Sequence, residues 1–179
     1  MVDLVGEGFD LAVRIGDLQD SSLAARRLGS IRRVACASPA YLRRYGVPKE
    51  PKDLAHHRGI AYSNVDDRQF WRFLNPQNEK EVTVNVHSRL HLNTGDALRE
   101  AALAGCGVTV LPTFIIHRSV AAGELVPLLL PFEQPPTSMH VVYPSKRNVA
   151  AKVRAFVDFM TTKFAPQPYW DRDVFGTGR

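Results

Sequence analysis

One segment, residues 93–112, constrains the fold more than any other part of the chain, because its sequence predicts a capped helix followed directly by a buried strand. The side chain of Asn93 or Thr94 can accept a hydrogen bond from the first free N–H groups of a helix. An apolar stripe then follows at the spacing of helical turns, in Leu98, Ala101, Ala102 and Gly105. Two glycines end the helix, and the apolar run 108–111 predicts a strand buried on both faces, as in a parallel sheet. A helix that begins at the edge of such a sheet can hold an anion.

The rest of the chain alternates between strand and helix patterns. Residues 9–15 indicate a first strand, and polar and apolar residues alternate along 81–93, which also indicates a strand. A last helix is indicated by an apolar stripe that consists of Val149, Val153, Phe156, Val157, Met160 and Phe164. Alternating strands and helices, with crossings between them, predict an α/β fold of two lobes.

Composition and charge exclude several classes of protein. The chain has 179 residues, of which 45% are apolar and 23% charged, as in an ordinary globular protein with a core. Its net charge of +5 suggests binding to nucleic acid. The basic and acidic residues are interleaved, however, which favours an ordinary solvated surface over a binding site for phosphates. No apolar run approaches the ~18–20 residues of a membrane helix, and the acidic first residues do not resemble a signal peptide. With two cysteines and no export signal, the chain is expected in a reducing cytoplasm.

The sequence contains no recognisable catalytic or metal-binding motif. It has no Gly-x-Ser-x-Gly, no His-Glu-x-x-His, no Walker loop and no dinucleotide-binding glycine turn after a strand. His87 and His91 would lie about 13 Å apart on a strand, so they cannot share one ion. We therefore predict no enzyme activity, no metal site and no cofactor.

Polar residues near the ends of predicted strands are the candidates for ligand binding, because ligands in open α/β sheets lie outside the carboxyl ends of strands. Arg14 ends the first strand, and Ser38 caps a predicted helix. Two helix starts and a guanidinium around one cleft favour a carboxylate or a similar small anion. The alternative is that the polar residues only cap helices and that Arg14 lies on the surface. Tyr62 is a candidate for a wall of the site, and Gly95 would allow close approach of the backbone. The candidates are therefore Arg14, Ser38, Tyr62, Asn93, Thr94 and Gly95.

Several segments resemble, in order, the effector-binding domain of LysR-type transcriptional regulators. Residues 93–112 are similar to the family's helix that opens on the inducer cleft, and 8–16 to the strand of its first regulatory subdomain. Residues 22–38 resemble the paired strands around the crossing into the second subdomain, and 38–42 the start of that subdomain's first helix. The likeness runs from about residue 2 to 164. It implies the two-lobed, type II fold of periplasmic binding proteins, hinged around a cleft.

The resemblance also implies a division of the chain. The first lobe uses residues 1–35 and 130–165, the second lobe uses 36–129, and 166–179 form a flexible tail. Family members begin with a winged helix-turn-helix, which has no counterpart in this sequence. We therefore expect a truncated regulator with an incomplete first lobe, in which apolar surface is exposed on the first strand, at Leu11 and Val13, and on the face of the last helix.

The function implied by the resemblance is an effector sensor. A small anionic effector would close the lobes and change the arrangement of a tetramer on DNA, and DNA binding would need the missing N-terminal domain. Self-association as a dimer or tetramer is expected of the full-length protein, in the cytoplasm and without membrane contact. The alternative is a solute-binding protein of a transporter, which has the same fold. An uncharacterised α/β enzyme is the third hypothesis.

Peroxide-sensing members of this family use two cysteines around the helix in 93–112. Alignment of that helix places their peroxidatic cysteine at Ala97 and their resolving cysteine at Cys106. Since alanine cannot form a sulfenic acid, no redox switch is expected here. Cys36, in an apolar strand pattern, is expected in the core.

Overall fold

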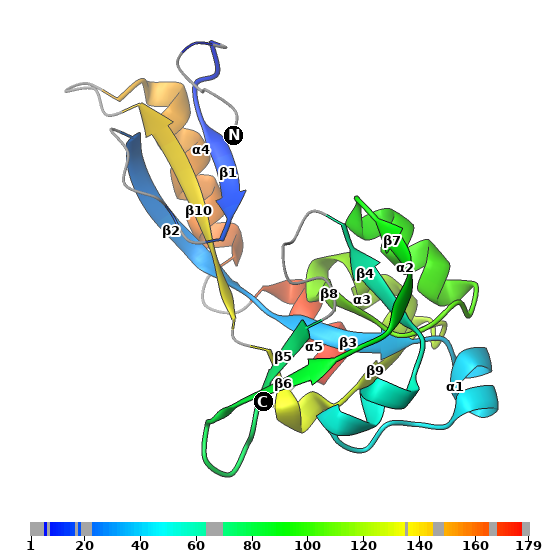
Figure 1. Cartoon of the computed structure of the whole chain (residues 1–179). Helices are drawn as coiled ribbons and strands as arrows, with labels where there is room; N and C mark the ends of the chain where they lie inside the picture. Colours follow the sequence, from blue (N-terminus) through cyan, green and yellow to red (C-terminus); the bar gives the residue numbers. More distant parts are fainter. Residues whose placement is uncertain are drawn as a thin grey trace. The chain divides into compact units, whose positions relative to one another are not determined.

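The structure is a computed structural model that describes residues 6, 8–16, 18, 23–63, 70–134, 136–144, 149–164 and 168–176. The chain forms two compact units (Figure 1). Unit 1 consists of Met1–Ile31 and Pro136–Tyr169, and unit 2 consists of Arg32–Pro135 and Trp170–Arg179. Both units are therefore assembled from segments that are far apart in the sequence.

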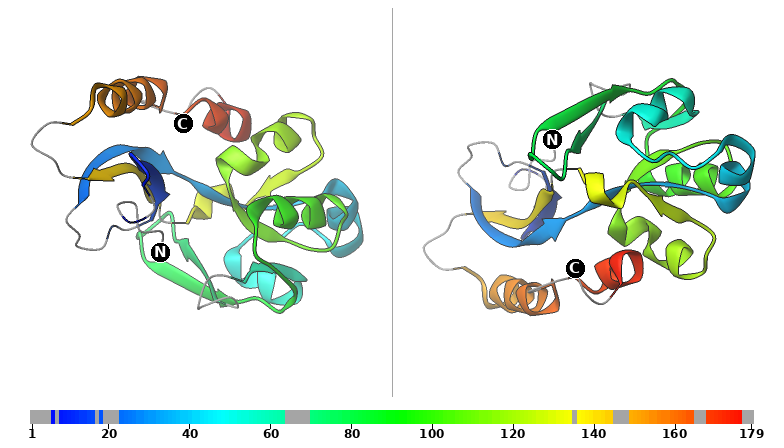
Figure 2. Two further views of the ribbon diagram at one scale, coloured as in Figure 1. Left: turned by 90° about the horizontal axis from the view of Figure 1, so that it is seen from above. Right: turned by 90° about the horizontal axis from the view of Figure 1, so that it is seen from below.

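Unit 1 is an antiparallel sheet covered by one helix. Across the sheet the strands are β1 (Ala12–Ile15), β10 (Thr137–Pro144) and β2 (Leu23–Ile31). The helix α4 (Ala151–Phe164) lies along one face of this sheet and contacts β2 (Figure 2). Its buried side chains, Val153 and Val157, are four residues apart and so share one face of the helix. They pack α4 onto the sheet.

Apolar side chains stay exposed in unit 1. Val13 and Ile15 are exposed on β1, and Phe159 is 62% exposed on α4. The predicted exposure is therefore confirmed at Val13 and on the last helix, whereas Leu11 is half-buried. The predicted apolar stripe is wrong at Phe156, which is exposed because it lies beside the line of buried valines on α4.

Unit 2 is built on two sheets that a β-bridge connects. The strands are β3 (Arg33–Ala37), β4 (Gly59–Tyr62), β7 (Ser88–Leu92), β8 (Thr109–Pro112) and β9 (Val126–Leu128). β3 lies between β8 and β9 and is antiparallel to both, whereas β4 and β7 are parallel. A parallel bridge between Gly59 and Val108 joins β4 to the residue just before β8. The predicted strand at 108–111 therefore has one parallel and one antiparallel neighbour.

Helices and a hairpin cover both faces of these strands. They are α1 (Pro39–Tyr45), η1 (Pro51–His56), β5 (Phe70–Leu74), β6 (Glu81–Asn85), α2 (Gly95–Leu103), α3 (Thr113–Ala121), η2 (Leu130–Phe132) and α5 (Tyr169–Phe175). Side chains of β3 alternate between two buried clusters. Ala35 and Ala37 pack against η1 and the hairpin of β5 and β6, and Val34 and Cys36 pack against α2 and α3. Within the described ranges, no helix is both long and apolar enough to cross a lipid bilayer.

The segment that most constrained the sequence analysis folds as predicted. α2 begins after Thr94, whose hydroxyl accepts the N–H of Ala97 at 3.2 Å. Gly105, with a φ of +76°, turns the chain after the helix. β8 then follows, and Val108 just before it is fully buried. The predicted order of cap, helix, glycine and buried strand is confirmed.

The C-terminal segment corrects the sequence analysis. A flexible tail is predicted for 166–179, and this is wrong for Tyr169–Phe175, which form α5. Trp170 and Val174 are buried, and Val174 belongs to the same cluster as α2 and α3. Burial of these side chains stabilises a helix that is too short to be stable alone. Residues 166, 167 and 177–179 lie outside the described residues.

The bounds of the two units also lie several residues from the predicted lobe bounds. The chain first crosses from unit 1 to unit 2 after Ile31 rather than after residue 35, because β3 belongs to the core of unit 2. The return comes after Pro135 rather than after residue 129, because Leu129 and Phe132 also pack in unit 2.

Candidate functional site

One edge of unit 2 collects the carboxyl ends of three strands. β4 and β7 are parallel, and their last residues, Tyr62 and Leu92, are paired in register. The Ser63 N–H continues this pairing by donating to the Leu92 carbonyl at 2.8 Å. The parallel bridge before β8 gives that strand the same direction. We call this the C-terminal edge, and it is defined by Tyr62, Asn93, Thr94 and Thr113. It is the edge at which α/β sheets hold ligands.

The start of α2 lies at the C-terminal edge with an exposed cap. Thr94 has the extended backbone of an N-cap, and its carbonyl accepts the N–H of Leu98 at 3.2 Å. Asn93 and Thr94 are both exposed. In the first turn, Asp96 is paired with Arg99 at 2.9 Å, so its carboxylate is directed to a partner on the same helix. The start of α2 therefore presents exposed polar groups, and its one acidic residue is paired with Arg99.

The start of α3 lies beside the start of α2. A Cβ at Gly95 would come within 2.4 Å of Cδ1 of Ile115, so the two first turns touch only because residue 95 is glycine. Nη1 of Arg99 also approaches the Ile115 carbonyl oxygen at 3.5 Å. Glycine at position 95 therefore serves the packing of α3 against α2, and the role of Gly95 in close approach to an effector stays a prediction.

Tyr62 ends β4 at the same edge and is 36% exposed. Its backbone is paired with Leu92, the residue before Asn93. The structure therefore brings four of the predicted residues together, namely Tyr62, Asn93, Thr94 and Gly95.

Ser38 lies at the opposite edge. β3 runs antiparallel to β8, so the end of β3 at Ala37 is far from the end of β8. Ser38 is 3% exposed, and its Oγ accepts the N–H of Tyr41 at 3.4 Å. It lies near Gly105, which follows the far end of α2. The nine residues of α2 span roughly 14 Å, and they separate Ser38 from Thr94. The expectation that the helix starts at Ser38 and Thr94 surround one cleft is therefore wrong, because β3 is antiparallel to β8.

Arg14 belongs to unit 1, whereas the other predicted residues belong to unit 2. It lies in β1 at the edge of the sheet, where its backbone is paired with His140 of β10. Its side chain is half-buried. The role of Arg14 as an effector ligand stays a prediction.

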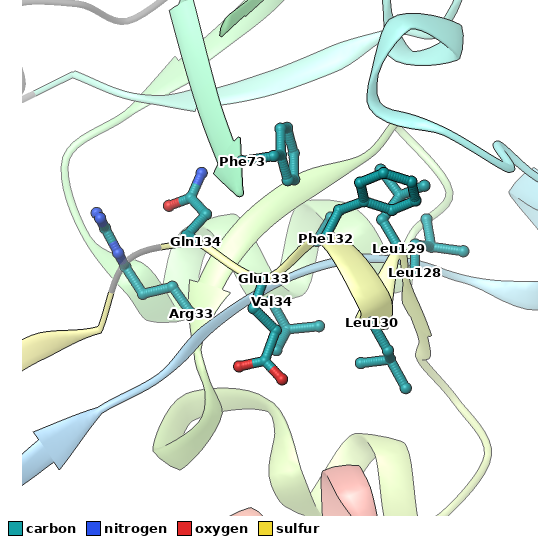
Figure 3. Close-up of a pocket in the computed structure, with 10 residues that line it drawn as sticks. Arg33, Val34, Phe73, Leu128, Leu129, Leu130, Phe132, Glu133 and Gln134 are labelled. Atoms are coloured by element: carbon teal, nitrogen blue, oxygen red, sulfur yellow. The ribbon is translucent and has the colours of Figure 1, made fainter. Parts of the chain in front are cut away.

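A second feature of the C-terminal edge was missed by sequence reasoning. Arg33, paired in register with Pro112, lines a small pocket together with Gln134 (Figure 3). The polar pair lies at one end of the pocket, and Phe132 and Leu130 lie at the other. Nε of Arg33 is buried without a hydrogen-bond partner among the described residues, and burial lowers the pKa of its guanidinium. The pocket is narrower than a water molecule.

The pocket beside Arg33 is separate from the start of α2. Along β3, residues 33, 35 and 37 share one face, and α2 packs on the other. The one sequence feature that could have indicated this pocket is the pair Arg32-Arg33. Adjacent residues on a strand point to opposite faces, so one of the two arginines had to lie on this face of β3. Nothing local indicated that Gln134 would lie beside Arg33.

The two cysteines lie towards the opposite edge, near the end of β3 and after the end of α2. Cys36 is fully buried, as predicted, and burial raises the pKa of its thiol to about 12. Cys106 is exposed. Across the described part of the chain, His, Cys, Asp and Glu side chains nowhere gather in a group of three that could hold a metal ion.

Comparison with protein families identifies a match over nearly the whole chain. Residues 1–165 match the family described as LysR substrate binding domain. An uncharacterised HTH-type transcriptional regulator of Haemophilus influenzae is 39% identical over 152 residues, which are 85% of this chain and 52% of that protein. The HTH-type transcriptional regulator PtxR of Pseudomonas aeruginosa is 36% identical over 167 residues, which are 93% of this chain and 53% of that protein. The chain spans about half the length of these relatives.

Solved structures agree with this match. CrgA of Neisseria meningitidis, a LysR-type transcriptional regulator, superposes with a TM-score of 0.78 at 29% identity, over 90% of this chain and 54% of that one. The isolated regulatory domain of CrgA gives a TM-score of 0.76 at 30% identity, over 88% of this chain and 76% of that one.

Proposed function

We propose that this chain, which belongs to the LysR substrate-binding domain family, is the effector-sensing part of a transcriptional regulator and binds a small anion at the C-terminal edge of unit 2. The relatives named above are regulators of transcription. This favours the regulator over the solute-binding protein of a transporter and over an enzyme. DNA binding, self-association and a cytoplasmic location are proposals for the full-length regulator, since this chain spans about half of such a protein.

The observation that carries the proposal of an anion is the meeting of two helix starts with three strand ends at one edge. α2 and α3 both begin there, beside the ends of β4, β7 and β8. The first N–H groups of a helix have no intrahelical partner, and they carry partial positive charge. An oxyanion is the ligand that such groups bind best.

Thr94 is the residue that we assign to direct contact with the effector. Its hydroxyl oxygen already accepts the N–H of Ala97, so the hydroxyl proton is available for a carboxylate. The exposed ring of Tyr62, at the end of the neighbouring strand, would form one wall. Asn93 would contribute an amide next to the same helix start. This arrangement favours a small carboxylate with an apolar part.

The test uses Thr94→Val, which keeps the shape of the side chain and removes the hydroxyl. Acetate and benzoate serve as probes, and binding is measured as the rise in melting temperature that a ligand of the folded state produces. We expect Thr94→Val to weaken binding of the probe that stabilises the wild-type chain by about 1–3 kcal/mol, which corresponds to one or two lost hydrogen bonds. Thr83→Val, at an exposed position on β6, is the matched control and should leave binding unchanged.

An unchanged response of Thr94→Val to a probe that stabilises the wild-type chain would reduce Thr94 to a structural cap. The proposal would then lose its contact residue, and the anion site would have to lie elsewhere in the chain.

A further inference from the structure

β1 has one open edge. It lies at the side of the sheet of unit 1, and β10 is its one strand neighbour among the described residues (Figure 1). The Gly16 N–H donates to the Ser138 carbonyl at 3.0 Å, and Gly16 and Arg14 are two residues apart, so Arg14 also directs its backbone groups to β10. The N–H and carbonyl groups of Val13 and Ile15 then point to the other side of β1. Such an edge can pair with a further strand.

Apolar side chains are exposed beside this open edge. Val13 is 41% exposed and Ile15 is 48% exposed. Residues in register across neighbouring strands point to the same face, and Ile15, Met139 and Gly29 are in register. A Cβ at Gly29 would lie 3.8 Å from the Phe164 carbonyl oxygen at the end of α4, so this is the face on which α4 lies. Val13 and Ile15 are therefore exposed although they share the face that the helix covers.

α4 continues this exposed apolar surface. Lys152 forms an exposed ion pair with Asp10, which precedes β1, so this side of α4 lies towards the open edge. Phe156 and Phe159 follow Lys152 at helical spacing on the same side, and both are exposed. We call this surface the β1 patch, and it is defined by Phe9, Val13, Ile15, Phe156 and Phe159. A contiguous exposed apolar patch marks a surface that contacts another molecule.

The segment 9–15, Phe-Asp-Leu-Ala-Val-Arg-Ile, is complementary to its own reverse. When two copies of the segment pair in antiparallel direction about Ala12, apolar residues meet apolar residues and an acid meets a base. The pairs are Phe9 with Ile15, Asp10 with Arg14, and Leu11 with Val13. Two-fold symmetry repeats each pair on the other side of the axis. The sequence therefore supplies a second copy of this chain with matching charge and matching apolar contacts.

The backbone of β1 suits the same register. Val13 of one copy lies opposite Leu11 of the second copy, and both residues direct their backbone groups to the open edge, so they can exchange hydrogen bonds. Ala12 meets Ala12 of the second copy on the axis, where a small side chain fits. In the register that is centred on Val13 instead, Asp10 would lie opposite Gly16, and the charge pairs would be lost.

We propose that the β1 patch is an interface between two copies of this chain, in which the segments 9–15 pair antiparallel about Ala12 and join two three-stranded sheets into one. The apolar residues of the patch pack across the axis, and Asp10 and Arg14 fix the register. The present ion pair of Asp10 with Lys152 is exposed on both sides and contributes little, so Asp10 can exchange it for Arg14 of the second copy. This interface goes beyond effector sensing and does not involve Thr94.

The first test reverses the charges. Asp10→Arg and Arg14→Asp should each weaken self-association roughly tenfold, because each sets like charges opposite each other on both sides of the axis. An equimolar mixture of the two variants should recover the affinity of the wild-type chain, because opposite charges then meet again. Sedimentation velocity over the micromolar range measures the association, and thermal melts establish that each variant is folded.

Arg26→Asp is the matched control for the charge reversal. Arg26 is exposed on β2, the strand at the other side of the same sheet. Its reversal should leave self-association unchanged, and a mixture of Arg26→Asp with Asp10→Arg should associate more weakly than the mixture of Asp10→Arg with Arg14→Asp.

A second measurement tests the register if a charge variant does not fold. It uses a Cys106→Ser background, in which Cys36 is buried and cannot cross-link. Ala12→Cys places two thiols on the axis, with Cα atoms about 4.5 Å apart, a distance that suits a disulfide. Mild oxidation should cross-link Ala12→Cys faster than Val13→Cys, because Val13 lies opposite Leu11 of the second copy.

A wild-type chain that stays monomeric throughout the micromolar range would overturn the interface. A dimer that neither Asp10→Arg nor Arg14→Asp weakens would also overturn it, because the copies would then meet at another surface. Faster cross-linking of Val13→Cys than of Ala12→Cys would overturn the register about Ala12.

Discussion

Ser38 and Thr94 are both hydroxyl residues that cap the start of a helix, yet they lie in opposite surroundings. Ser38 is buried at the edge where β3 ends, and Thr94 is exposed at the edge where β4, β7 and β8 end. Each accepts the N–H of the residue three positions later, Tyr41 and Ala97 respectively. The local hydrogen bond is the same, and only the direction of the preceding strand differs. A cap therefore indicates a helix start, whereas strand direction decides whether that start can meet a ligand.

The largest effect is expected from the core face of α2, which separates the two caps. Leu98 is 1% exposed and belongs to the cluster formed with α3 and α5. Leu98→Ala should lower the free energy of unfolding by about 2–5 kcal/mol, because it leaves a cavity in a packed core. The loss is measured by urea denaturation. Leu103→Ala, at a partly buried position on the same helix, should cost less. Equal costs would show that the assigned core face of α2 is wrong.

An intermediate effect is expected from the caps themselves. Ser38→Ala removes the acceptor of a buried N–H, and should lower the free energy of unfolding by roughly 1–2 kcal/mol. Thr94→Ala exposes the corresponding N–H to water, so its cost should fall at the low end of cap substitutions, about 0.5 kcal/mol. Denaturant melts of the two variants side by side give the order. If Thr94→Ala lowered the free energy of unfolding more than Ser38→Ala, the contrast between a buried and an exposed cap would be wrong.

The smallest effect is expected from pH, at the end of unit 2 that contains Ser38. The Tyr41 hydroxyl accepts the Arg58 N–H at 2.9 Å and lies 3.2 Å from Nδ1 of His57, to which its own proton can be donated when that nitrogen is unprotonated. This contact suits a neutral ring. Burial lowers the pKa of His57, an effect to which His56 adds and which Asp53 opposes.

Because the pKa of His57 is lower in the folded chain, the unfolded chain binds a proton first as the pH falls. Stability should therefore be lost as the pH decreases from about 6.5, the usual histidine value, through the lowered value of the folded state. The measurement is the urea midpoint against pH for the wild-type chain and for His57→Gln, with His87→Gln as the exposed control. Parallel curves for wild type and His57→Gln would assign the pH dependence to other groups.

Much of the fold was predictable because local patterns and the family resemblance agree. The α/β two-lobed fold and the relation to LysR-type regulators are confirmed by the family match and by the superposition on CrgA. The sequence 93–112 carries its own cap, apolar stripe and glycine stop, so its helix and strand needed no knowledge of distant residues. By contrast, the helix at Tyr169–Phe175 is short, and burial of its side chains in unit 2 stabilises it.

The sequence by itself determined which segments form helices and strands, where several helices are capped, and which family the chain resembles, because those properties depend on neighbouring residues and on motifs. Tertiary structure alone decided that Ser38 and Thr94 are on opposite edges, that Arg33 lies beside Gln134, and that Trp170 of α5 packs on Phe114 of α3. These pairings join residues far apart along the chain. Their direction and register come from packing of the whole core, which no local pattern encodes.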